Sequence, residues 1–133
     1  KALVIAPSFS EYEEALRSVG AEVEYYYLCE EDNFQIREDY VDKLSEEIDM
    51  IFLCNPNNPT GQTIDRDMLI KILDRCKKQN IVVILDECFL EFLDEPNRYE
   101  MSDLRGEYPL TNHQSIYKNI QYAGTASWLC NQQ

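Results

Sequence analysis

The sequence has few of the residues from which metal and phosphate sites are usually built. Its 133 residues include one histidine, His113, and five cysteines without a Cys-x-x-Cys spacing, so a histidine–cysteine metal site has little to draw on. Lys and Arg number 12 against 25 Asp and Glu, which gives a net charge of −13. A surface this acidic repels phosphate backbones and anionic lipids, which argues against binding to nucleic acid or to a membrane surface.

Long hydrophobic runs and glycine-rich loops are also absent from the sequence. No apolar run approaches the ~20 residues that a membrane span needs, and no phosphate loop of the Gly-x-Gly-x-x-Gly or Walker type is present. The odd number of cysteines favours reduced thiols in a cytoplasmic protein over a disulfide framework. The chain begins with Lys1 and enters an apolar run at once, so we expect a fragment of a longer protein.

What the sequence does contain is an alternation of apolar strands and amphipathic helices. The expected strands are 2–6, 23–28, 50–54 and 81–85. The expected helices begin at Ser10, near Arg37 and after Asp65, and the second of them extends to about Glu47. Strands that are apolar throughout and separated by helices are typical of a parallel sheet buried on both faces. We therefore predict an α/β fold with a mostly parallel sheet flanked by helices.

Local signals mark where the expected helices begin and end. Ser10 and Glu13 have the spacing of a capping box, and Gly20 is suited to the position that follows a helix. Asp65 precedes the third apolar stripe and is expected to cap that helix.

Two strand ends carry the residues most suited to chemistry, because ligands of open α/β sheets bind beyond the carboxyl ends of the strands. One end leads into the Asn- and Pro-rich loop 55–61, and the other leads into Asp86. Taken singly, such a loop more often only forms a turn than binds a ligand. Such an aspartate is likewise more often a loop residue or a helix cap than a functional residue.

Taken together, residues 54–61 and 85–89 resemble the fold-type I pyridoxal-phosphate enzymes of the class I/II aminotransferase family. The resemblance implies that Asn58, in an Asn-Pro-Thr-Gly motif, bonds the phenolic oxygen of the cofactor and that Asp86 pairs with its pyridinium nitrogen. It also places Phe9 where an aromatic side chain stacks on the cofactor ring, with a core Phe as the alternative. A protonated ring nitrogen makes this cofactor an electron sink, which is why the carboxylate is needed.

Within that family, the threonine-phosphate decarboxylases are the group that the sequence resembles most. The segments that carry this likeness are 9–16, 52–54, 74–77 and 86–92. The resemblance implies a homodimer that converts L-threonine O-3-phosphate to 1-amino-2-propanol phosphate for cobalamin synthesis. The related histidinol-phosphate aminotransferases usually have a Tyr where this chain has Phe89, and they are the alternative function. A non-catalytic acidic α/β domain that binds a partner is the alternative outside the enzymes.

The end of the sequence departs from the family pattern. The lysine that forms the Schiff base should follow Tyr108 in a segment reading about Phe-Thr-Lys and then Pro-Gly-Leu-Arg-Leu-Gly-Tyr. If codons are read one base out of frame, residues 116–119 allow the first motif and residues 123–130 allow the second. We therefore divide the chain into a cofactor-binding part, 1–109, and an atypical tail, 110–133, interpreted as an out-of-frame reading. Lys118 is then a weak Schiff-base candidate, and the chain as given is expected to be inactive.

Overall fold

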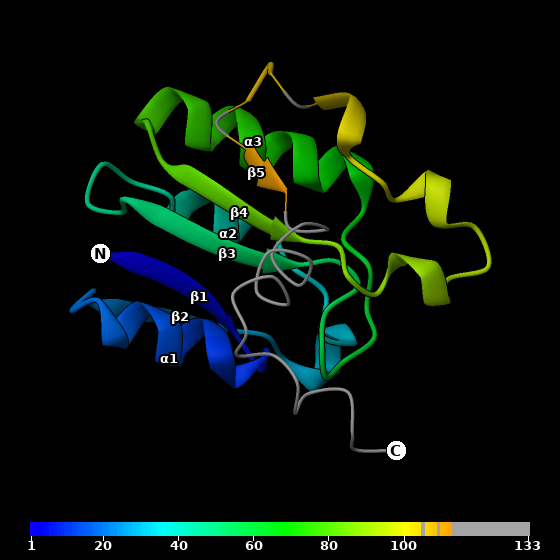
Figure 1. Ribbon diagram of the computed structural model, residues 1–133, viewed down its shortest axis with the longest axis horizontal. Helices are drawn as coiled ribbons and strands as arrows, with labels where there is room; N and C mark the ends of the chain where they lie inside the picture. Colours follow the sequence, from blue (N-terminus) through cyan, green and yellow to red (C-terminus); the bar gives the residue numbers. More distant parts are fainter. Residues whose placement is uncertain (105, 109, 113–133) are drawn as a thin grey trace, which may run out of the picture.

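The computed structural model describes residues 1–104, 106–108 and 110–112, which form a five-stranded sheet with helices packed on it (Figure 1). The strands are β1 (Ala2–Ala6), β2 (Val23–Tyr27), β3 (Met50–Cys54), β4 (Val82–Asp86) and β5 (Leu110–Asn112), in the spatial order β2-β1-β3-β4-β5. The α-helices are α1 (Ser10–Ser18), α2 (Asp39–Lys43) and α3 (Arg66–Gln79). Short 3₁₀ helices lie at Glu30–Asp32, Leu90–Phe92, Pro96–Arg98 and Ser102–Leu104.

All neighbouring strands of the sheet run parallel, which confirms the predicted α/β class. In the centre of the sheet, β3 and β4 are in register so that Cys54 lies opposite Asp86 at their carboxyl ends. The two strand ends that the sequence marked for chemistry are therefore neighbours in space.

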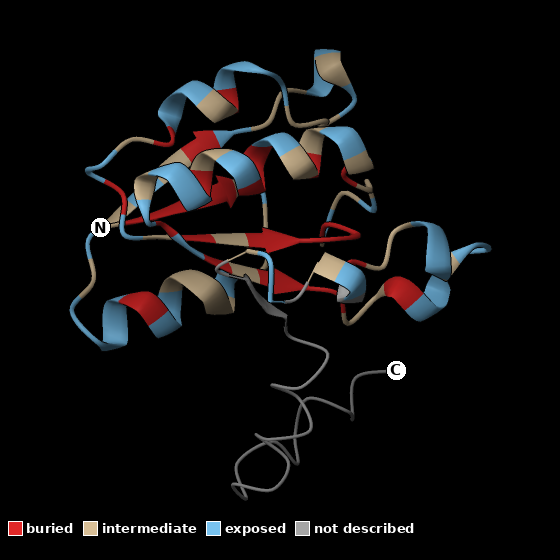
Figure 2. Cartoon of the chain, turned by 90° about the horizontal axis from the view of Figure 1, so that it is seen from above, coloured by how far each residue is buried: buried red, intermediate tan, exposed pale blue. Residues whose placement is uncertain are grey.

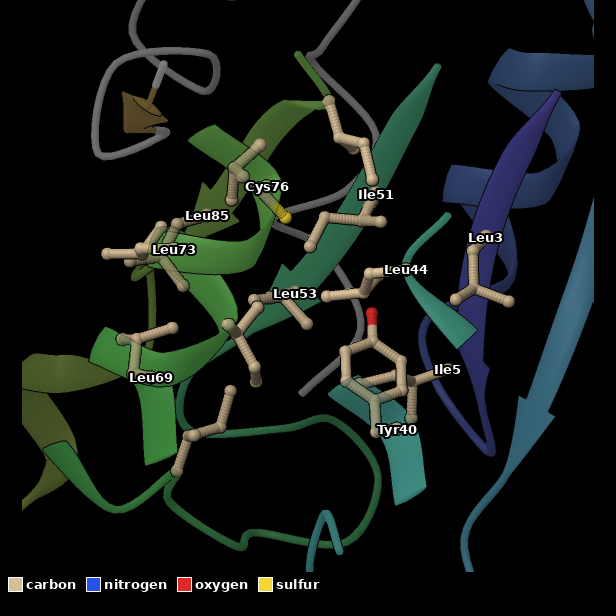
Figure 3. Packing of buried hydrophobic residues seen from close by; sticks show 14 of the residues in the cluster. Leu3, Ile5, Tyr40, Leu44, Ile51, Leu53, Leu69, Leu73, Cys76 and Leu85 are labelled. Atoms are coloured by element: carbon tan, nitrogen blue, oxygen red, sulfur yellow. The ribbon is translucent and has the colours of Figure 1, made fainter. Parts of the chain in front are cut away.

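Side chains that alternate along the strands build one apolar layer on each face of the sheet. The larger layer joins Leu3 and Ile5 of β1 to buried residues of α2 and α3, and Figure 3 shows this packing around Tyr40 and Leu69. The smaller layer joins Ala2 and Val4 of the same strand to helix α1. Figure 2 shows the buried residues concentrated in the strands, with the exposed residues on the outer sides of the helices.

The helix-end signals are confirmed at two positions and wrong at one. The carboxylate of Asp65 accepts hydrogen bonds from the backbone N–H groups of Asp67 and Met68, and Gly20 follows α1 with a φ of 77°. The predicted capping box does not form, because α1 already includes Ser10 and its N-cap is Phe9, without a side-chain cap. Glu13 accepts instead from Arg17 Nε at 2.7 Å.

Helix α2 is shorter than the predicted helix from Arg37 to Glu47. The helix ends at Lys43 because Leu44 leaves the helical region with a ψ of 88°. Arg75 of α3 donates from Nε to the Leu44 carbonyl oxygen at 2.8 Å, which gives that carbonyl a partner outside the helix. The apolar pattern that suggested a longer helix is still buried, since Leu44 has no exposed surface.

Strand β5 was not predicted, because three residues are too few to show a hydrophobic period. Leu110–Asn112 pairs parallel with β4, so the first residues of the atypical tail join the sheet. The rest of the tail, including Lys118, lies outside the described residues. In the part of the chain that the structure describes, no helix is long and apolar enough to cross a membrane.

Candidate functional site

The carboxyl ends of β1, β3 and β4 meet at one edge of the sheet and hold the candidate site. The backbone N–H of Asn55, just after β3, donates to the Asp86 carbonyl oxygen at 2.8 Å, which joins the ends of β3 and β4. On the other side, β1 leads through Pro7 and Ser8 to Phe9. The sheet register therefore brings together the three segments that the sequence singled out.

Asp86 is a buried carboxylate whose two oxygens each have one hydrogen-bond donor. Asp86 is only 6% exposed. Oδ1 accepts from the Cys88 backbone N–H at 2.9 Å, and Oδ2 accepts from the Tyr12 hydroxyl at 2.6 Å. Among the described residues, no Lys, Arg or His forms an ion pair with it. Because an unpaired buried charge is costly, this site suits a ligand with a positive charge.

An aromatic cluster links Phe9 to this carboxylate. The ring of Phe9 meets the ring of Tyr12 edge-on, with centroids 5.8 Å apart, and Tyr12 stacks on Phe52 at 5.2 Å. Burial is the main cause that raises the pKa of Tyr12 far above its ordinary value, and its bond to Asp86 adds to the effect. Phe9 itself is half-buried, so part of its surface is open at the site.

The loop after β3 is fixed by the side chains of two asparagines. Asn57 Nδ2 donates to the Pro7 carbonyl oxygen at 3.0 Å and to Thr60 Oγ1 at 2.9 Å, which joins the loop to the end of β1. Asn55, which has no exposed surface, accepts the Ile64 backbone N–H at 2.9 Å through Oδ1. At Gly61, a φ of 71° allows its N–H to bond the Asn57 carbonyl oxygen at 2.7 Å.

Asn58 occupies the open side of this loop. Its side chain forms no hydrogen bond with any other residue of the described part, so its amide is available to a ligand. The residue lines a cavity of about 410 Å³ together with Phe89 and Phe92 from the segment after β4. The remaining lining residues are Pro56, Asn57, Pro59, Gly61 and Leu93. None of these side chains carries a charge.

Glu87, the residue after Asp86, holds the segment that follows the site. It is 1% exposed, and its Oε1 accepts from the Met101 backbone N–H at 3.0 Å. Arg66, at the start of α3, donates to the Glu100 carbonyl oxygen at 3.4 Å and pairs with Asp103 at 2.5 Å. These contacts fix residues 100–103 beside the carboxyl end of the sheet.

The structure therefore brings Phe9 and Asp86 into one cluster and places Asn58 on the neighbouring loop. Sequence reasoning missed Tyr12, Asn55 and Asn57, which orient these groups. The signal for Tyr12 was available: it lies three residues after Phe9, one helical turn further on, so both side chains share one face.

Comparisons with known proteins show which family the chain resembles. The family model "Aminotransferase class I and II" matches residues 1–127. Threonine-phosphate decarboxylase of Salmonella typhimurium is 42% identical over 93 residues, which are 70% of this chain and 26% of that protein.

Two solved structures show the same fold. Histidinol-phosphate aminotransferase from Clostridium acetobutylicum matches with a TM-score of 0.75 and 32% identity, over 84% of this chain and 33% of that one. A PLP-dependent aminotransferase from Streptococcus suis matches with a TM-score of 0.60 and 25% identity, over 65% of this chain and 23% of that one. The chain thus spans only about a quarter to a third of the length of these relatives.

Proposed function

This chain belongs to the aminotransferase class I and II family, whose members are pyridoxal-phosphate enzymes, and we propose that the full-length protein is an L-threonine O-3-phosphate decarboxylase. In that reaction the bond between Cα and the carboxylate breaks, carbon dioxide leaves, and a proton takes its place at Cα. The product is 1-amino-2-propanol phosphate, for cobalamin synthesis. The proposal that a cationic cofactor ring binds here rests on the buried carboxylate of Asp86, which has no cationic partner among the described residues.

The described residues suit this cofactor. Asp86 would pair with the ring nitrogen and keep it protonated, since each of its oxygens has a second acceptor position beyond the bonds to Tyr12 and Cys88. Asn58 would donate from its available amide to the phenolic oxygen, and Phe9 would pack against one face of the ring. When bound, pyridoxal phosphate supplies an electron sink for the charge left at the substrate Cα.

The chain's own residues also determine how firmly these groups are held. Asn57 fixes the loop that carries Asn58, and its bond to Pro7 keeps that loop at a constant distance from the Phe9 segment. The cavity next to Asn58 has mainly apolar walls. Because the lining side chains are uncharged, the cations that bind the substrate's phosphate and carboxylate must come from other parts of the full-length protein.

Two observations favour the decarboxylase over the histidinol-phosphate aminotransferase. Identity is 42% to the Salmonella decarboxylase and 36% to the histidinol-phosphate aminotransferase of Ruminiclostridium cellulolyticum. In addition, Phe89 lines the cavity without a hydroxyl, whereas the aminotransferases that the sequence resembles usually have Tyr there. We also propose that the full-length protein is a homodimer, as the family resemblance implies.

Carbon dioxide release tests the proposed activity. The full-length, in-frame protein with L-threonine O-3-phosphate should form carbon dioxide and 1-amino-2-propanol phosphate without any keto acid. Histidinol phosphate with 2-oxoglutarate is the control pair. Faster turnover of the control pair would assign the protein to the aminotransferases, and the absence of pyridoxal phosphate from the purified protein would favour a partner-binding domain.

We further propose that residues 110–133 are an out-of-frame reading of the segment that carries the Schiff-base lysine. The proposal rests on residues 116–119 and 123–130, whose codons allow the family's motifs in a shifted frame. The DNA sequence across the codons for residues 105–118 tests this directly. A single inserted or deleted base relative to an uninterrupted gene is expected, and an intact reading frame would contradict the proposal.

A further inference from the structure

Tyr12 is the described side chain with the most direct control over Asp86. Its hydroxyl lies 2.6 Å from Asp86 Oδ2, although 74 residues separate the two positions in the sequence. We propose that Tyr12 is a positioning residue that holds the Asp86 carboxylate toward the ring nitrogen of the cofactor. This inference rests on the function proposed above, because it assigns a role toward the same cofactor.

The ring of Tyr12 is fixed from two sides. Phe52 of β3 stacks on it with an interplanar angle of 27°, and Phe9 meets it at 75°. A phenol held between two rings places its hydroxyl at one point in space, so Asp86 receives a donor whose direction does not vary. The Cys88 backbone N–H holds the second oxygen at 2.9 Å, and together the two bonds set the plane of the carboxylate.

The electrostatics of the pair fix which group donates. Burial, followed by the neighbouring Cys54 and Asp86, raises the pKa of Tyr12, which favours the protonated form of its hydroxyl. Tyr12 therefore acts as the donor of this bond and Asp86 as its acceptor. A carboxylate fixed in direction is what a pyridinium nitrogen needs as its partner.

The matched control is Tyr40, a fully buried tyrosine. Its hydroxyl lies among apolar side chains and has no hydrogen-bond partner. Tyr40 belongs to the layer with α2 and α3, on the face of the sheet opposite to Tyr12 and α1. Tyr12→Phe and Tyr40→Phe therefore remove the same atom from a half-buried and a buried tyrosine, and only the first removal changes the surroundings of Asp86.

The test measures binding of two ligands to the full-length protein and its variants. One ligand is pyridoxal phosphate, and the other is its analogue with C–H in place of the ring nitrogen, which has no charge to pair with Asp86. Tyr12→Phe should weaken binding of pyridoxal phosphate by about ten- to a hundredfold, as expected for loss of a hydrogen bond to a charged group. Binding of the analogue should change by less than about threefold, and Tyr40→Phe should leave both affinities at the wild-type value.

A second background separates positioning from general support of the fold. With Asp86→Asn already present, adding Tyr12→Phe should cost less than about threefold, because the acceptor is no longer charged. The inference would be overturned if Tyr12→Phe weakened binding of both ligands equally, or if its effect were undiminished in the Asp86→Asn background. It would also be overturned if Tyr12→Phe bound both ligands as tightly as Tyr40→Phe does. A wild-type protein that does not bind pyridoxal phosphate would overturn the proposed function first, so the two failures are distinguishable.

Discussion

Asn57 donates from Nδ2 to the carbonyl oxygen of Pro7 at 3.0 Å and so joins two segments of the candidate site that are 50 residues apart in sequence. The same nitrogen donates to Thr60 Oγ1, which closes the loop on itself. Neither Asn58 nor Phe9 takes part in these bonds. The geometry of the two proposed cofactor contacts thus depends on a residue that has no proposed contact with the cofactor.

Replacing Asn57 with Ala should therefore destabilise the protein. The change removes two hydrogen bonds, to the Pro7 carbonyl and to Thr60 Oγ1, from a side chain whose residue is 9% exposed, and we expect a loss of about 1–3 kcal/mol in the free energy of unfolding. Denaturant unfolding of the full-length protein measures the loss. Asn97→Ala, at an exposed position, is the control and should stay within about 0.5 kcal/mol of wild type. Equal stabilities for the two variants would refute the role given to Asn57.

Replacing Asn58 with Ala should affect activity more than stability. Its side chain has no hydrogen bond to lose within the described part of the protein, but it is placed to donate to the charged oxygen of the cofactor. We expect a loss of about 1–3 kcal/mol in transition-state stabilisation, measured as a fall in kcat/KM for threonine phosphate. The free energy of unfolding should be nearly unchanged. A variant that loses stability but keeps its kcat/KM would show that Asn58 is a structural residue of the loop.

Replacing Tyr40 with Phe should keep or raise stability. The Tyr40 hydroxyl is buried among apolar side chains, close to Leu44 in Figure 3, and has no hydrogen-bond partner. Removing an unsatisfied buried hydroxyl removes its desolvation cost, so the melting temperature should not fall. Tyr26→Phe is the contrasting variant, because the Tyr26 hydroxyl bonds Asp39 Oδ1 at 2.5 Å, and its loss should cost about 1 kcal/mol. A Tyr40→Phe variant less stable than Tyr26→Phe would contradict this account of the core.

The 133-residue chain itself should form no specific covalent adduct with pyridoxal phosphate. Lys118 is the candidate for such an adduct, and we interpret it as a product of the shifted reading frame. Borohydride reduction with pyridoxal phosphate, followed by mass spectrometry, should give only scattered, substoichiometric labelling of lysines. A stoichiometric adduct confined to Lys118 would overturn both the expected inactivity and the frameshift proposal.

Much of the fold could be predicted from sequence, because strands buried on both faces have continuous apolar runs. The runs at β1, β3 and β4 and the cap at Asp65 are local signals, and the structure confirms them. The length of α2 could not be predicted, since Arg75, distant in sequence, supplies a partner for the Leu44 carbonyl oxygen. Strand β5 could not be predicted for a related reason, because its three residues are ordered by a long-range pairing with β4.

The site could be predicted in part. Asn58 lies in a recognisable motif and Asp86 at a strand end, so both residues could be proposed from the sequence without the structure. The spacing of Tyr12 from Phe9 signals only the contact between those two rings. The bonds of Tyr12 to Asp86 and of Asn57 to Pro7 span 74 and 50 residues, and no spacing in the sequence encodes them.

Replacement of Asp86 is the most direct test of the claim that this buried carboxylate holds a cationic cofactor ring. In the full-length, in-frame protein, Asp86→Ala should lower kcat/KM for threonine phosphate by at least about a hundredfold, because it removes one partner of a buried charge pair. Asp94→Ala, at an exposed position, should behave as wild type. If Asp86→Ala instead kept most of the wild-type activity, Asp86 would not be the partner of the ring nitrogen and the account would be wrong.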